Sequence, residues 1–254
     1  MNKPIGNRPF GQASWRWLVQ AVGLPVWLGL AWTLPAATPW ETTAREVVQK
    51  LFEDGIHELA SREAEDFLLR YPGSEYTAEV ALILAQSHLA RHRPEDAATV
   101  LLQYRAQAGP LEDEFVFWLG QARAEQRRWA EAAEAFAEVN RRFPESARRF
   151  EACYREAWAR FESGDLGGAI NRLHAADGPL ARLRQQQPDN EWIVRCDLLL
   201  GEALWRKGDL PAARQQLEAL RDRPMGAALA WQREFLLANV QLALQQPDQA
   251  LAHT

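Results

Sequence analysis

Two histidines, His88 and His92, have the spacing of a metal-binding pair. On a helix, residues four apart lie on one face, where two imidazoles can reach a single ion. No third ligand accompanies the pair, and the catalytic glutamate of zinc-protease helices is missing. Arg91 and Arg93 add positive charge beside it. We therefore predict no metal site, and we expect His88 to fill an aromatic position of its helix.

Other reactive side chains give equally little support to catalysis. Cys153 and Cys196 are predicted on neighbouring helices, and a disulfide needs Cα atoms within about 7 Å, closer than helix axes usually approach. We expect two free thiols. The sequence shows no glycine-rich phosphate loop, no serine nucleophile elbow and no isolated carboxylate pair in an apolar setting. We therefore predict a protein that is not an enzyme and that uses no cofactor.

The composition indicates which elements must hold these residues. Ala and Leu number 42 and 33, whereas Val and Ile number only 11 and 5, so the intrinsic preferences favour helices over a large sheet. The formal net charge of -5 provides no electrostatic footprint for nucleic acid, and we predict no nucleic-acid partner. An all-α protein is expected.

The pattern of the first 37 residues predicts an export segment. Lys3, Arg8 and Arg16 precede an apolar run from Leu18 to Trp32, and small residues and prolines follow. A cleaved signal peptide is the favoured interpretation, with cleavage after Ala31 or near Ala36 and Ala37. The alternative is an uncleaved inner-membrane anchor over residues 17–37, which would be the only membrane contact. The protein is expected to be exported, and to be periplasmic or associated with the cell envelope.

A repeated motif occupies the rest of the chain. Leu119-Gly120-Gln121-Ala122, followed by Trp129-Ala130-Glu131-Ala132-Ala133 and Phe143-Pro144, recurs in part at Leu200-Gly201-Glu202-Ala203. A small residue marks the predicted second helix of each unit, at positions 60, 97, 132, 169, 213 and 250. Small residues at helix crossings let two backbones approach, and Gly164-Asp165 and Gly208-Asp209 supply turns between helices.

This motif resembles the tetratricopeptide repeat, or TPR. The resemblance implies a right-handed α-solenoid of about six helix-turn-helix units over residues 38–254. The predicted units are 41–77, 78–112, 113–149, 150–193, 194–230 and an incomplete 231–254. We expect the natural protein to continue beyond Thr254, because a solenoid normally ends on a polar capping helix.

Three residues depart from the repeat pattern. Arg123, Glu156 and Arg160 fall at or near positions that the family usually makes apolar. Either the phase of the repeat is locally shifted, or Glu156 and Arg160 form a partly buried pair one helical turn apart. We favour the shifted phase. Gly178-Pro179 should also break the long fourth unit.

In the TPR family the first helix of each unit lines a concave groove that binds peptides. Mapping those positions onto this chain predicts an apolar and aromatic groove, which suits protein or peptide partners. The lysine of the carboxylate clamp known in the family is missing from the corresponding positions. The predicted groove residues are Phe52, Leu82, Leu89, Phe117, Gln121, Tyr154, Trp158, Phe161, Leu198, Glu202, Trp205, Phe235 and Asn239.

These features predict a non-catalytic interaction scaffold of the bacterial cell envelope, of undetermined oligomeric state. The junctions around Tyr71-Pro72-Gly73 and Phe143-Pro144-Glu145 are similar to those of periplasmic TPR proteins, including the outer-membrane assembly lipoprotein and the Tol-Pal-associated coordinator. This chain lacks a lipobox cysteine and has more repeats, so their specific roles are not transferred. The alternative is a recognition arm of a longer envelope enzyme or transport component whose active domain lies beyond residue 254.

Overall fold

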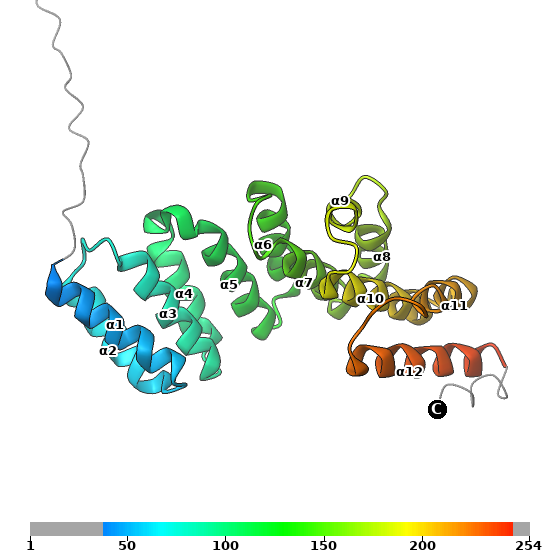
Figure 1. Ribbon diagram of the computed structural model, residues 1–254, viewed down its shortest axis with the longest axis horizontal. Helices are drawn as coiled ribbons and strands as arrows, with labels where there is room; N and C mark the ends of the chain where they lie inside the picture. Colours follow the sequence, from blue (N-terminus) through cyan, green and yellow to red (C-terminus); the bar gives the residue numbers. More distant parts are fainter. Residues whose placement is uncertain (1–37, 246–254) are drawn as a thin grey trace, which may run out of the picture. The chain divides into compact units, whose positions relative to one another are not determined.

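The computed structural model describes residues 38–245, which form helices without any strand. The predicted signal or anchor segment and the predicted last helix lie outside these residues. Figure 1 shows the helices following one another from the blue end to the red end. They are α1 (Pro39–Glu53), α2 (His57–Arg70), α3 (Thr77–Ala90), α4 (Pro94–Tyr104), α5 (Glu112–Glu125), α6 (Trp129–Arg142), α7 (Arg149–Glu162), α8 (Leu166–His174), α9 (Pro179–Gln186), α10 (Glu191–Lys207), α11 (Leu210–Glu218) and α12 (Ala227–Ala243). Two 3₁₀ turns, Arg105–Gln107 and Gly109–Leu111, lie between α4 and α5.

Packing follows the repeat. Each helix packs on its chain neighbour, and most first helices also pack on the next first helix, as α1 does with α3 and α10 with α12. This arrangement confirms the all-α repeat fold. No helix among residues 38–245 is both long and apolar enough to cross a membrane.

Small residues bring the helices of a unit together. A Cβ added at Gly201 would lie 2.6 Å from Leu217 Cδ2, and one added at Gly120 would lie 2.8 Å from the Phe136 ring. The alanines of the second helices at positions 97, 132, 169 and 213 are fully buried. The close approach predicted from the small residues is therefore present, and the large side chain of the second helix fills the space beside it.

A left-handed residue ends the first helix of each described unit. Gly164 and Gly208 have φ of 84° and 90°, and the aspartate that follows each one caps the next helix. His92 occupies the same turn after α3, with φ of 57°. The expectation that His88 and His92 share a helix face is therefore wrong, because α3 ends at Ala90 and the chain reverses at His92.

The core runs along the array as clusters joined by shared side chains. Trp118 packs against the cluster around α3 and against the one around α6. Trp158 joins the α6 cluster to the one between α7 and α10, and Leu204 joins that cluster to the last one. Core residues of one unit are thus completed by those of the next, as repeat proteins require.

A buried ion pair explains two of the three departures from the repeat pattern, Glu156 and Arg160. Glu156 is 1% exposed and accepts hydrogen bonds from Arg172 Nε at 2.8 Å and from Arg160 Nη2 at 3.4 Å. The repeat keeps its phase here, because α7 and α8 pair as the other units do. The favoured shifted phase was wrong, and the paired carboxylate was the correct alternative.

The fourth unit carries an additional helix. The chain breaks at Gly178-Pro179, as expected, and α9 follows with Leu180 and Leu183 buried. Arg184 of α9 and Arg223 both pair with Asp197 of α10, the latter at 3.3 Å. Burial raises the pKa of Asp197, while the two arginines oppose that shift. This ionic link ties α9 to the wall of the fifth unit.

Candidate functional site

Part of the predicted groove is core. Phe117 and Leu198 are 1% exposed, and Leu82, Leu89 and Phe161 are also buried. Phe117 packs edge-on against Phe136, with ring centroids 5.5 Å apart, and the Arg148 guanidinium covers it at 5.0 Å. Phe161 still borders the cavity described below, whereas the side chains of the other four residues do not form an open wall. These four positions are corrected to core, because their side chains pack inside the hydrophobic clusters between helices.

The predicted groove remains open between α7 and α10. A cavity of about 200 Å³ there is bordered by Tyr154, Trp158 and Phe161 of α7 and by Glu202 of α10. Its other borders lie outside the prediction and are mostly charged or polar, with one leucine: Glu162, Arg195, Leu199, Arg206 and Gln232. We call this opening the α7/α10 cleft. It combines aromatic surface with charge, and it is more polar than the sequence predicted.

The aromatic side chains of the α7/α10 cleft are supported from behind. Trp158 meets Trp129 edge-on, with centroids 5.2 Å apart, and Tyr154 lies 5.6 Å from Trp192. Burial raises the pKa of Tyr154, so its phenol stays neutral and can donate a hydrogen bond at ordinary pH. A wall held in this way loses little freedom when a partner binds.

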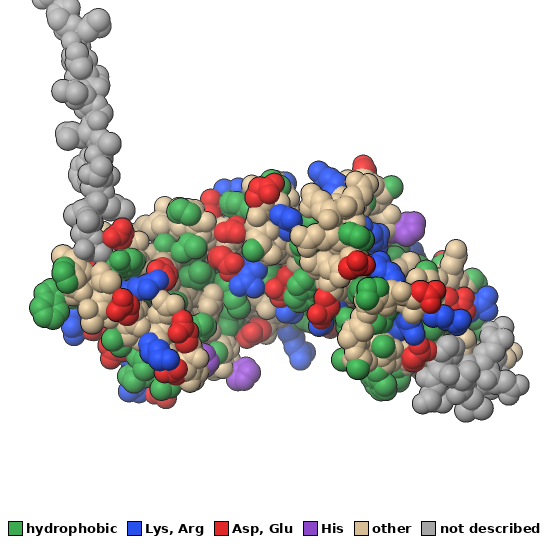
Figure 2. Space-filling model, in the orientation of Figure 1, with side chains coloured by type: hydrophobic (Ala, Val, Ile, Leu, Met, Phe, Trp, Pro, Cys, Tyr) green, Lys and Arg blue, Asp and Glu red, His purple; other side chains and the backbone are tan. Residues whose placement is uncertain are grey.

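Charges at the cleft are balanced by close partners. Arg206 Nη2 donates to Glu202 at 2.9 Å while its guanidinium lies 4.7 Å from the centre of the Phe161 ring. Arg195 pairs with Glu191 at 2.5 Å and covers Trp192. Figure 2 shows the same mixing on the face that it presents, where basic and acidic side chains alternate. The cleft therefore offers hydrogen-bonding groups in fixed directions, and its charged residues do not all have the same sign.

Helix α12 adds an exposed aromatic pair. The rings of Trp231 and Phe235 stack with centroids 5.4 Å apart and an interplanar angle of 13°. Trp231 is 68% exposed and Phe235 is 50% exposed. Phe235 and Asn239 are predicted groove residues, and the Asn239 amide donates to the Phe235 carbonyl at 2.7 Å, whereas Trp231 was not predicted. The spacing of four residues between the two aromatics was the signal that could have found it.

Three predicted residues are half-buried elsewhere. Phe52 packs on His57, with centroids 5.3 Å apart, and belongs to the rim of the first core cluster. Trp205 packs against the last cluster, and Gln121 lies half-buried on α5. None of the three borders the α7/α10 cleft. Of the predicted groove residues, the structure therefore brings together at the α7/α10 cleft only Tyr154, Trp158, Phe161 and Glu202. Phe235 lies on the neighbouring α12.

Thiols and metal ligands add no reactive centre in the described part of the chain. Cys153 and Cys196 are free and fully buried, and burial together with the neighbouring Cys153 thiol raises the pKa of Cys196. Between Thr38 and Gln245, no three His, Cys, Asp or Glu side chains gather as metal ligands.

Comparisons with known proteins agree with the repeat fold. The tetratricopeptide-repeat family model matches residues 82–152. PilW, described as a widely conserved type IV pilus biogenesis factor, superposes with a TM-score of 0.62 at 16% identity, covering 85% of this chain and 91% of PilW. PilF of Pseudomonas aeruginosa gives 0.60 at 14% identity, covering 84% and 88%. MamA from Desulfovibrio magneticus RS-1 gives 0.53 at 19% identity, covering 69% and 90%. No curated protein sequence matches the chain.

Proposed function

We propose that this chain, a tetratricopeptide-repeat protein whose family match spans residues 82–152, is a non-catalytic scaffold that binds a partner segment in the α7/α10 cleft. The observation that carries the proposal is the wall of Tyr154 and Trp158, which is held rigid by Trp192 and Trp129. Aromatic anchors in supported positions are typical binding hot spots. TPR arrays are protein-interaction modules in general, and this cleft supplies a specific place for the contact.

The chemistry of the cleft describes the partner segment. Aromatic or aliphatic side chains would pack on Trp158 and the Phe161 edge, while backbone or polar groups would bond Glu202, Arg206 and Gln232. The stacked Trp231 and Phe235 on α12 would extend the contact, because exposed aromatics gain most from being covered.

We also propose that the protein acts in the cell envelope. The basic residues, apolar run and small residues over positions 1–37 support export, either as a cleaved signal or as a retained anchor. N-terminal sequencing of the protein from fractionated cells decides between the two forms. A start near residue 32 or 38 in the soluble periplasmic fraction is expected, whereas an intact Met1 on membrane-bound protein contradicts cleavage.

Site-directed crosslinking tests the cleft. A photoreactive amino acid at Gln232 should crosslink one partner in cells, and the same amino acid at Val47, which is 44% exposed on α1, should not. Replacing Trp231 and Phe235 together with alanine should weaken the Gln232 crosslink while circular dichroism stays unchanged, since both rings are exposed. Equal crosslinking from Gln232 and Val47, or no effect of the double variant, contradicts binding at this site.

A further inference from the structure

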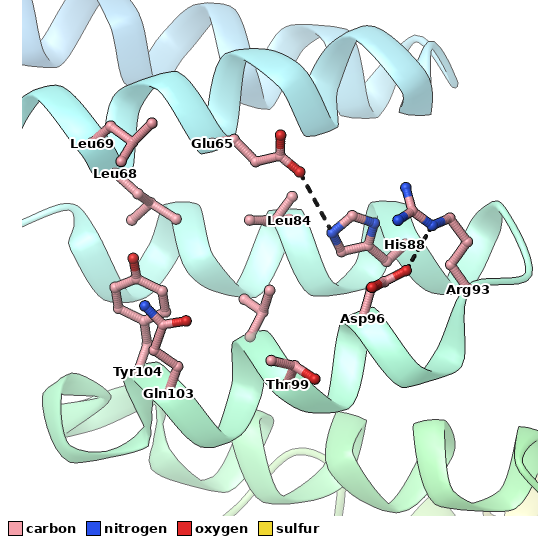
Figure 3. Close-up of a pocket in the computed structure, with 11 residues that line it drawn as sticks. Glu65, Leu68, Leu69, Leu84, His88, Arg93, Asp96, Thr99, Gln103 and Tyr104 are labelled. Carbon is pink, nitrogen blue, oxygen red and sulfur yellow. Dashed lines mark ion pairs between the residues drawn. The ribbon is translucent and has the colours of Figure 1, made fainter.

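A second cleft lies on other helices, between α2 and α4, with α3 beneath it. It has a volume of about 400 Å³, twice that of the α7/α10 cleft. Figure 3 shows Leu68, Leu69 and Tyr104 toward one end and Glu65, His88 and Asp96 toward the other. We call it the α2/α4 cleft. One part offers aliphatic surface, and the other offers ionisable groups.

Two of the three charged side chains that line the polar end are acidic. Glu65 lies 3.9 Å from His88 Nε2 and its side chain is 55% exposed. Arg93 is engaged by Asp96 at 2.6 Å. Burial and the charge of Arg93 lower the pKa of His88, so the imidazole is neutral at pH 7 and does not neutralise Glu65. His88 is 3% exposed, and its Nδ1 has no hydrogen-bond partner among the described residues.

The equivalent cleft of a later unit shows which features are special. A cavity of about 410 Å³ lies between α8 and α11, with Leu200 and Leu204 of α10 in its lining. Counted from the buried alanines Ala97 and Ala213, these leucines correspond to Leu84 and His88. The cleft is therefore a recurring feature of the packing, whereas the buried imidazole facing an acidic side chain belongs to the α2/α4 cleft.

We propose that the α2/α4 cleft binds a helical segment of a partner protein that presents aliphatic side chains beside a lysine or arginine. Lining residues on α4 run from Asp96 to Tyr104, a rise of about 12 Å, which accommodates two turns of a helix. Aliphatic side chains of that helix pack against Leu69 and Val100, over a floor formed by the buried Leu68 and Leu84. Its cation reaches the Glu65 carboxylate, whose charge His88 leaves uncompensated.

Leu69 marks the rim of this contact. It is 81% exposed, borders the cleft and would be covered by the bound helix. Leu59, on the same helix and 40% exposed, does not border the cleft. Glu58, also on α2, pairs with Arg62 at 2.6 Å and likewise lies outside it. These two residues provide matched controls for Leu69 and Glu65.

Titration of the full protein with fluorescein-labelled amphipathic peptides tests the proposal. A helix-stapled Leu/Lys peptide should bind, and a Leu/Glu peptide with the same leucine pattern should bind at least about tenfold more weakly. Leu69→Ser should weaken the Leu/Lys peptide by about tenfold through lost apolar contact, and Glu65→Gln by about threefold or more. Leu59→Ser and Glu58→Gln should leave the Kd unchanged.

Four outcomes would overturn the proposal. Equal affinity for the two peptides would show that Glu65 does not select a peptide with a cation. Equal effects of Leu69→Ser and Leu59→Ser would show that the peptide does not bind at the α2/α4 cleft. If Leu69→Ser and Glu65→Gln both keep peptide binding while the Trp231→Ala/Phe235→Ala protein loses it, the peptide binds at the α7/α10 cleft and α12 instead. Self-association that disappears in Leu69→Ser, measured by sedimentation, would replace the partner helix with a second copy of the chain. Circular dichroism verifies that each variant is folded.

Discussion

The Arg172 guanidinium of α8 donates from Nε to the buried Glu156 carboxylate of α7 at 2.8 Å, inside the fourth helix pair. Glu156 keeps its place because Arg160 contributes a second contact from the other side. A buried carboxylate left without its partner is costly, since neither solvent nor protein then compensates its charge. The pair therefore fixes how α8 packs on α7, next to the α7/α10 cleft.

Removing Arg172 should destabilise the protein strongly. Arg172→Ala leaves Glu156 buried with Arg160 alone, and the free energy of unfolding should fall by about 3 kcal/mol. Arg214→Ala is the control, because Arg214 and Glu218 form an exposed pair at 3.7 Å, expected to contribute about 0.3 kcal/mol. Urea denaturation measures both. Equal stability of the two variants would show that the buried pair is not needed.

Acid should destabilise the protein through His88. Burial, together with the charge of Arg93, lowers the pKa of His88 in the folded state below that of a free imidazole, while Asp96 and Glu65 only partly oppose this. Below pH 6.5 the unfolded chain therefore binds one more proton, and stability falls as pH decreases, by at most about 1.4 kcal/mol per pH unit. His88→Leu, which imitates Leu204 in the equivalent position, removes this contribution. Urea unfolding at pH 7.5 and 5.5 should show a smaller difference for the variant than for the wild type.

Adding one methyl group at Gly201 should disturb the fifth helix pair. The new Cβ would lie 2.6 Å from Leu217 Cδ2, so Gly201→Ala should reduce stability by about 1–3 kcal/mol through overpacking. Gly73→Ala is a suitable control, because no atom lies within 4 Å of its added Cβ. Thermal unfolding followed by circular dichroism compares them. An unchanged melting temperature for Gly201→Ala would contradict the close approach of α10 and α11.

The two cysteines should be reduced and protected. Both side chains are fully buried, and the pKa of Cys196 is raised, so little thiolate is available for reaction. Ellman's reagent should label two thiols rapidly in unreduced, denatured protein and label them slowly in native protein. Absence of free thiols after denaturation would mean that the protein as isolated carries the disulfide.

Local sequence determined the repeat. Alanines and glycines at regular intervals specify where two helices cross, and Gly164 and Gly208 specify left-handed turns, because each of these effects acts within one helix pair. The break at Gly178-Pro179 was equally readable, since proline and glycine act on their own backbone. The all-α fold and the burial of His88 followed from such signals.

Tertiary structure decided which of the predicted groove positions are open. Phe117 and Leu198 occupy equivalent helix positions to Tyr154 and Phe235, yet the first two are buried and the last is half exposed. Helix periodicity gives the face of a residue, whereas the side chains that neighbouring helices place over that face determine whether solvent or a partner reaches it. The same reason explains Glu156. Its charge appeared to violate the pattern until α8 placed Arg172 beside it, a contact between residues 16 positions apart that no local pattern encodes.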